Sequence, residues 1–199
     1  MTTSLAKLVQ AMRAQFAEGT GRSDDAGAEA AKVLALLPDL PTAVTLPPGT
    51  GHAVLRHVRQ IAAIPGLLDG HFAALADRLP WRFGYLPRAD APGLENEMGW
   101  AELVGPAAPI KSDKVGFGLT MIGPYTHYLA HLHPAVELYK VVLGTALWTA
   151  EGKTSERSPG TFILHPSNVV HAMRTGEQAL LAIYSWTGDI VSPSIYADA

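Results

Sequence analysis

One stretch of the chain, His131-Leu132-His133-Pro134-Ala135-Val136-Glu137, carries two imidazoles and a carboxylate within a few residues. Side chains two residues apart on a β-strand point to the same face, so His131 and His133 can project together. Glu137 can return to that face after the break at the proline. A third imidazole, His171, follows in a second apolar segment. The pattern indicates that donors from two separated β-segments converge on one site.

The donor types at this site predict a metal of a particular kind. The chain contains no cysteine, which excludes thiolate ligands, disulfides and cysteine nucleophiles. Imidazole and carboxylate without thiolate suit one divalent transition metal, such as Zn, Fe(II) or Mn. A site with three or four protein ligands keeps positions open for a substrate, which is typical of a catalytic metal. The residue types do not decide among these metals.

Away from the site, the chain changes character near Pro80. Apolar residues at helical spacing before this point predict helices over 5–16, 24–37, 52–64 and 67–79. Short apolar runs after it, punctuated by Gly and Pro, predict strands over 100–104, 115–122, 126–131, 136–143, 145–150, 161–164, 169–174 and 180–187. We therefore expect a helical segment, residues 1–80, to pack on a β-sandwich or barrel, residues 81–199.

The composition excludes some classes of binding partner. The 199 residues carry a net charge of −3, and Lys and Arg are thinly spread, which argues against nucleic acid. No apolar run approaches the roughly 18 residues of a membrane-spanning helix, and residues 1–19 lack the apolar core of a secretory signal. We expect a cytoplasmic protein that acts on a small molecule. The oligomeric state is left open.

Two spaced motifs resemble those of the cupin family. The first joins His131, His133 and Glu137 to Gly144, and the second runs from Gly160 through Pro166 to His171. The resemblance implies a double-stranded β-helix barrel, in which these three histidines and the glutamate hold the metal. Three positions depart from the family pattern, because Tyr125, Asn168 and Thr175 stand where Gly, Gly and Asn are usual. These positions concern turns and strand ends rather than ligands.

Longer stretches resemble the cupin-type dimethylsulfoniopropionate (DMSP) lyases, particularly the Q-type. They are residues 127–139, residues 98–106 and a terminal strand with Tyr184 and Trp186. The resemblance implies a β-elimination that splits this sulfonium carboxylate into dimethyl sulfide and acrylate. Tyr139 matches the family's general base, and Tyr128 matches its second active-site tyrosine.

Recognition of a sulfonium, which donates no hydrogen bond, calls for aromatic faces. Tyr184, Trp186 and Tyr128 are the candidates for substrate binding. Strict alternation from His131 places Tyr128 on the opposite face, so only a bulge or turn between them brings it into the site. His165, in a turn before a proline, is expected to face solvent or to make a simple hydrogen bond.

Two other functions fit the same residues. An Fe(II) cupin dioxygenase acting on a small organic acid or thiol would use a similar ligand set. A non-catalytic cupin would bind a small molecule without consuming it. Oxygen consumption or recovery of an unchanged ligand would separate these alternatives from the lyase.

Overall fold

The computed structural model describes residues 4–197. Helices and 3-10 turns occupy most of the first half, as α1 (Ser4–Ala17), η1 (Glu18–Gly21), α2 (Asp25–Leu36), α3 (Leu55–Ala62), η2 (Leu67–Gly70), η3 (Ala76–Arg78) and α4 (Leu94–Glu97). The strands follow, as β1 (Met98–Gly105), β2 (Ile110–Lys111), β3 (Gly116–Ile122), β4 (His127–Leu132), β5 (Val136–Leu143), β6 (Ala146–Ala150), β7 (Lys153–Arg157), β8 (Phe162–His165), β9 (His171–Thr175), β10 (Leu180–Thr187) and β11 (Ile195–Tyr196).

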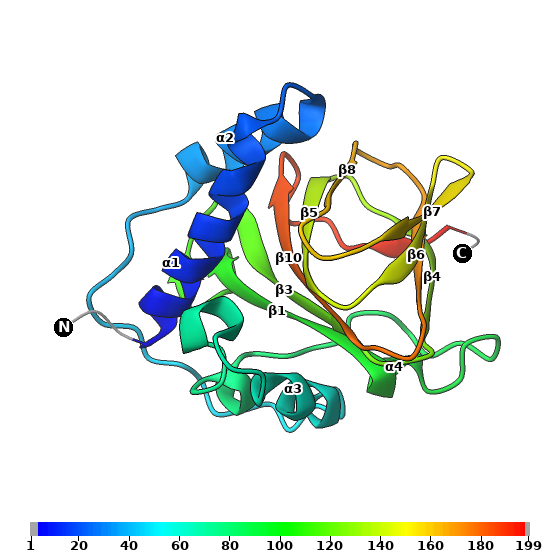
Figure 1. Ribbon diagram of the computed structural model, residues 1–199, viewed down its shortest axis with the longest axis horizontal. Helices are drawn as coiled ribbons and strands as arrows, with labels where there is room; N and C mark the ends of the chain where they lie inside the picture. Colours follow the sequence, from blue (N-terminus) through cyan, green and yellow to red (C-terminus); the bar gives the residue numbers. More distant parts are fainter. Residues whose placement is uncertain (1–3, 198–199) are drawn as a thin grey trace.

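The strands form two facing sheets, and the helices lie outside one of them (Figure 1). One sheet has the order β2-β1-β3-β10-β5-β8, and the other has the order β11-β4-β9-β6-β7. Pairing is antiparallel throughout except between β1 and β2. The predicted fold class, a double-stranded β-helix preceded by helices, is confirmed.

The helices bury the outer face of the six-stranded sheet, and a second apolar cluster fills the barrel. Every residue of β3 is buried because both of its faces are covered. Phe117 and Leu119 belong to the core shared with α1, α2 and α3, whereas Ile122 belongs to the cluster inside the barrel. The predicted division into residues 1–80 and 81–199 stays a prediction, since one core runs through both.

A buried cation joins the helical layer to the barrel. Lys140 of β5 is only 3% exposed, and its Nζ donates to the carbonyl of Gln15 at 3.0 Å. It also lies 2.8 Å from Glu18 Oε2. A positive charge at the last turn of α1 complements the helix dipole. Lys140 therefore points away from the barrel interior, on the opposite side of the strand from Tyr139.

The predicted helix over 67–79 is wrong. This segment contains only the short turns η2 and η3, and Leu68 and Asp69 adopt φ values of 48° and 56°. Left-handed backbone interrupts the helical hydrogen-bond ladder, although Leu68 and Phe72 are still buried in the shared core. Apolar spacing here reflects burial of an irregular segment rather than helical periodicity.

Strands β2, β7 and β11 were not predicted. Strand β7 is almost entirely exposed, so it lacks the apolar alternation by which strands are recognised. The turn between β6 and β7 is a two-residue hairpin turn, in which Glu151 and Gly152 both have positive φ, 50° and 73°. Gly152 is the residue in this turn that could have indicated a hairpin from the sequence. The charged edge also discourages pairing with another sheet.

Two of the three departures from the cupin pattern fall at left-handed backbone positions. Tyr125 and Asn168 have φ values of 52° and 61°, a region that glycine usually occupies. Thr175, the third departure, is buried, and its hydroxyl donates to the carbonyl of Gly123 at 2.6 Å. The turns thus keep their left-handed geometry without glycine.

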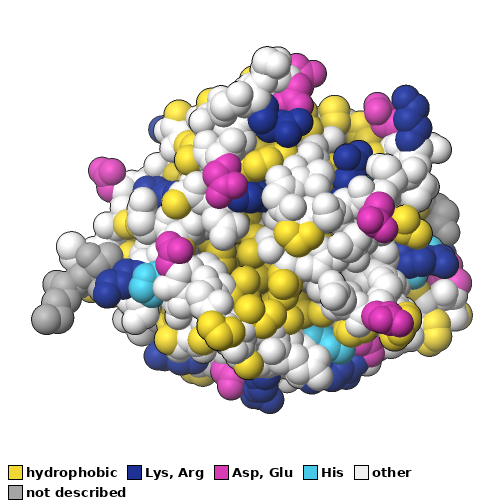
Figure 2. All heavy atoms as spheres, in the orientation of Figure 1, with side chains coloured by type: hydrophobic (Ala, Val, Ile, Leu, Met, Phe, Trp, Pro, Cys, Tyr) yellow, Lys and Arg dark blue, Asp and Glu magenta, His cyan; other side chains and the backbone are white. Residues whose placement is uncertain are grey.

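Acidic and basic side chains are interspersed over the face shown in Figure 2, and apolar side chains gather between the helices and the barrel. Among residues 4–197, no helix combines the length and apolar character needed to cross a membrane. The cytoplasmic location stays a prediction.

Candidate metal centre and cavity

Three buried side chains bring possible metal-binding atoms together inside the barrel. His133, Glu137 and His171 each offer one donor atom, and these atoms all lie within 4.8 Å of one another. Glu137 Oε2 is 3.0 Å from His133 Nε2 and 3.3 Å from His171 Nε2. The site thus joins β5 and the segment before it to β9 of the other sheet, as the sequence pattern indicates.

Backbone carbonyls orient the imidazoles. The Nδ1 of His131, His133 and His171 lies 2.8, 3.0 and 2.9 Å from the carbonyl oxygens of Leu129, Ala135 and Val169. A carbonyl can only accept, so each Nδ1 carries the proton and each Nε2 is left to face the interior. His171 Nε2 is buried without a partner in hydrogen-bonding geometry. This orphaned atom and the donor set fit a divalent transition metal.

His131 lies beside this cluster rather than within it. Its ring is edge-on to His171, with centroids 4.0 Å apart, and 6.4 Å from the ring of His133. Its other neighbour is Tyr128, which stacks on it at 3.9 Å. Burial and the nearby His171 hold the pKa of His131 well below its usual range. Its predicted role as a ligand stays a prediction.

The Glu137 carboxylate is held from two sides. Trp186 Nε1 donates to Oε1 at 2.8 Å, while His133 contacts Oε2. Burial alone would raise the pKa of Glu137, but His133 and His171 outweigh it and hold this pKa well below the usual range. Burial would also lower the pKa of His133, and Glu137 reverses this and raises it. Each partner therefore favours the charged form of the other.

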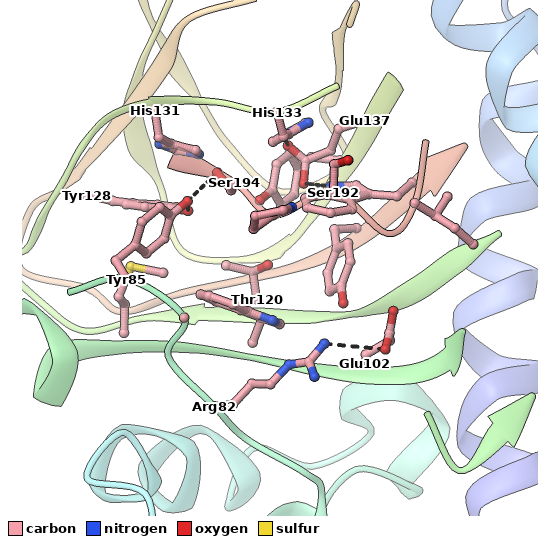
Figure 3. A pocket seen from close by; sticks show the side chains of 18 of the residues that line it. Arg82, Tyr85, Glu102, Thr120, Tyr128, His131, His133, Glu137, Ser192 and Ser194 are labelled. Carbon is pink, nitrogen blue, oxygen red and sulfur yellow. Dashed lines mark hydrogen bonds and ion pairs between the residues drawn. The ribbon is translucent and has the colours of Figure 1, made fainter. Parts of the chain in front are cut away.

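A cavity of about 300 Å³ opens next to this cluster. Its lining includes the predicted residues Tyr128, His131, His133, Glu137, Tyr139, Tyr184 and Trp186, together with Arg82, Tyr85, Trp100, Glu102, Thr120 and residues 190–194. Figure 3 shows His131, His133 and Glu137 together on one side of the cavity, with the Arg82–Glu102 pair on the other. The cavity thus has two chemically distinct ends.

Tyr128 reaches the cavity through an irregularity in β4. The register between β4 and β9 shifts between Tyr128 and His131, which is the bulge that the sequence made necessary. The Tyr128 hydroxyl lies 2.5 Å from that of Tyr85, and Tyr85 donates in turn to Ser194. These bonds fix the Tyr128 ring at the cavity wall.

Tyr139 and Tyr184 pair directly across β5 and β10, so both side chains face the cavity. Tyr139 also hydrogen-bonds to Thr120. Burial, together with Glu137, raises the pKa of Tyr139 well above its usual value. Burial does the same for the pKa of Tyr184, with Glu102 as the next cause. Both phenols are therefore neutral in the metal-free chain at neutral pH.

His165 is fully buried, so of its two expected environments, solvent exposure and a simple hydrogen bond, the structure shows the second. Its ring stacks on that of His171 at 3.9 Å, and its Nε2 accepts from Trp148 Nε1 at 2.9 Å. Burial lowers the pKa of His165 to about 3. Residue 165 ends β8 rather than standing in the following turn, so its side chain points inward. Trp148 is itself buried in the apolar cluster inside the barrel.

Several cavity residues were not among the predicted site residues, and they include Arg82, Tyr85, Trp100 and Glu102. Trp100 and Glu102 lie in the stretch 98–106, on alternate positions of β1, and this alternation was the available signal. Arg82 and Tyr85 lie in an irregular segment, and no periodicity there could have placed them.

Comparison with known proteins agrees with this geometry. A family model described as dimethylsulfoniopropionate lyase matches residues 53–182. The lyase DddQ of Ruegeria pomeroyi is 28% identical over 134 residues, covering 63% of this chain and 67% of that protein. DddL of Cereibacter sphaeroides, described as a proposed lyase of the same kind, is 31% identical over 119 residues, covering 58% of this chain and 49% of its own length.

The alignment thus spans about half of DddL. A solved structure reported with the DMSP lyases RdDddP and RnDddQII is 25% identical, with a TM-score of 0.75 over 98% of this chain and 97% of that one. The family match covers well over half of the chain, and the fold extends along nearly all of it. The chain therefore belongs to the dimethylsulfoniopropionate lyase family and has its cupin fold.

Proposed function

We propose that this protein cleaves DMSP into dimethyl sulfide and acrylate by β-elimination. The proposal depends above all on one observation: the buried His133–Glu137–His171 cluster opens into the cavity that also receives Tyr139. Membership of the family supports the same reaction. The relatives named as lyases supply the substrate class, a sulfonium carboxylate.

The metal ligands in this proposal are His133, Glu137 and His171, whose donor atoms lie close together, with His131 as the fourth. A divalent cation bound there would act as a Lewis acid toward the substrate carboxylate and would favour ionisation of a nearby phenol. The ring of His131 contacts those of His171 and Tyr128, which places its imidazole beside the other three ligands. The choice among Zn, Fe(II) and Mn is left to experiment.

Tyr139 is the general base. It removes the proton from the carbon next to the substrate carboxylate, the electron pair of that C–H bond forms the new C=C bond, and the C–S bond breaks. Dimethyl sulfide leaves with the C–S electron pair, and acrylate and one proton remain. Burial and Glu137 oppose ionisation of this phenol, so its activity depends on a positive charge close by.

Aromatic side chains bind the substrate. Tyr184 and Trp186 lie on one face of β10 with ring centroids 6.5 Å apart, and Tyr128 lines the cavity from β4. Their π-faces attract the sulfonium and exclude water from the leaving group. The Tyr128 hydroxyl, held by Tyr85, is directed along the cavity wall.

The decisive test measures acrylate from DMSP with protein loaded with Zn, Fe(II) or Mn in turn. We expect acrylate and dimethyl sulfide in equal amounts with at least one metal. Absence of acrylate with every metal, from protein shown by elemental analysis to be loaded, would refute the proposal. Oxygen consumption with a thiol or organic acid under Fe(II) would favour the dioxygenase instead.

A further inference from the structure

The cavity end opposite the metal cluster carries a charge pair that the proposed reaction does not use. Glu102 Oε2 accepts from Arg82 Nη2 at 3.3 Å. The two partners differ in burial, since the Glu102 side chain is 12% exposed and the Arg82 side chain 50%. Arg82 is thus the more exposed partner, and the two side chains lie beside each other at this end of the cavity (Figure 3).

The register of the sheet places Glu102 on the same face as the proposed base. Glu102 of β1 is paired with Gly118 of β3, Gly118 with Tyr184 of β10, and Tyr184 with Tyr139 of β5. Directly paired residues in neighbouring strands share a face of the sheet. Glu102, Tyr184 and the proposed base Tyr139 therefore form one row along the cavity wall.

Two glycines of β3 leave space for this wall of the cavity, Gly118 for the Tyr184 ring and Gly116 for the Glu102 carboxylate. Gly118 interrupts the row, and the Tyr184 ring lies over it, 2.8 Å from where a β-carbon would be. A β-carbon on Gly116 would lie 3.3 Å from Trp186 Cβ and 3.5 Å from Glu102 Oε1. The carboxylate therefore lies near the two aromatic residues that are expected to bind the sulfonium.

Two carboxylates line the cavity, and Glu102 is the one outside the metal cluster. Glu137, the other carboxylate in the lining, is engaged by His133 and Trp186. Burial raises the pKa of Glu102, and Arg82 opposes this shift. Arg82 thus favours the ionised carboxylate while reducing its attraction for a cation in the cavity.

We propose that Glu102 is a specificity-determining residue that selects a cationic group at this end of the cavity, with Arg82 setting the strength of the selection. The inference rests on the proposed function, which places the substrate carboxylate at the metal cluster. The sulfonium then points toward Glu102, Tyr184 and Trp186. An uncharged tail of the same shape gains the aromatic contacts but not the electrostatic attraction.

The test compares two unreactive carboxylates that differ in charge but scarcely in shape. In 3-(trimethylammonio)propanoate a cationic nitrogen occupies the position that a carbon occupies in 4,4-dimethylpentanoate. Their dissociation constants would be measured by calorimetry on metal-loaded wild type, Glu102→Gln and Arg82→Gln. Wild type is expected to bind the cationic ligand several-fold more tightly than the uncharged one, because Glu102 attracts the cation and Arg82 only partly offsets this attraction.

The two variants should move this preference in opposite directions. Glu102→Gln should abolish or reverse it, since Arg82 then repels the cation, and Arg82→Gln should increase it. A general loss of cavity structure would instead weaken the binding of both ligands to both variants. The surface change Glu156→Gln on β7 is the matched control, and its preference should equal that of wild type.

An unchanged preference in Glu102→Gln, or equal binding of both ligands by wild type, would overturn the inference. Neither result depends on turnover. Acrylate formation by the same wild-type preparation shows separately whether the proposed function stands, so the two failures are distinguishable.

Discussion

Replacing Trp186 by Phe tests whether the indole N–H organises the metal cluster. The substitution keeps an aromatic ring beside His133, whose centroid is 4.5 Å away, and removes the donor that lies 2.8 Å from Glu137 Oε1. Glu137 is 3% exposed, so water does not readily replace the lost bond. The sequence predicted only a substrate-binding role for this side chain.

The magnitude follows from the type of bond. A hydrogen bond to a charged group contributes about 1.5–3 kcal/mol. Loss of such a contact to a metal ligand typically weakens metal affinity about 10- to 100-fold. We expect the dissociation constant for Zn to rise by that factor in Trp186→Phe, while the folded fraction at 25 °C stays unchanged.

The assay is a competitive titration of the metal-free protein against a chelating dye. Trp100→Phe is the matched control, because this indole lines the same cavity but packs on Phe83 and Tyr85 rather than on Glu137. Unaltered Zn affinity in Trp186→Phe, or an equal loss in Trp100→Phe, would refute the reasoning.

Three further predictions concern the base, a turn and a buried histidine. Tyr139→Phe should abolish acrylate formation while elemental analysis finds wild-type metal content, and substantial residual turnover would exclude Tyr139 as the base. Gly144→Ala should lower the free energy of unfolding by at least about 2 kcal/mol in urea, because φ is 77° and the new β-carbon would lie 2.0 Å from the Ala179 carbonyl oxygen. Gly152→Ala, with φ of 73° and open space, should cost less, and equal costs would contradict this account. The pKa of His165 is about 3 in the folded chain and about 6.5 when unfolded, so the unfolded state binds the proton first. This contribution to stability is present above pH 6.5 and is lost as pH falls toward 3, by up to about 1.4 kcal/mol per pH unit. Urea titrations of the metal-free protein at pH 7 and 5 should show a smaller pH dependence in His165→Gln, and an unchanged difference would exclude His165 as its source.

Much of the fold was predictable because it depends on local pattern. The apolar stripe at helical spacing in residues 5–16 specifies α1, and short apolar runs between glycines specify most of the strands. The paired motifs around His133 and His171 resemble those of the cupins, and this resemblance implied the barrel. Strand β7 and the segment 67–79 were missed because exposure and left-handed backbone remove the periodicity on which such predictions depend.

The proposed metal ligands were also within reach of the sequence. Their spacing along two strands is preserved in the structure, where His133, Glu137 and His171 gather. Local spacing fixes which side chains share a strand face, and this is the information that a motif contains.

Tertiary structure decided what surrounds that cluster. A bulge in β4 turned Tyr128 into the cavity, and register across four strands placed Glu102 in one row with Tyr139. An irregular segment brought Tyr85 to Tyr128. Sequence by itself determined the donors and the type of fold, because both follow from residue type and short-range periodicity. The cavity wall depends on pairings between residues tens of positions apart, and only packing of the complete chain selects those pairings.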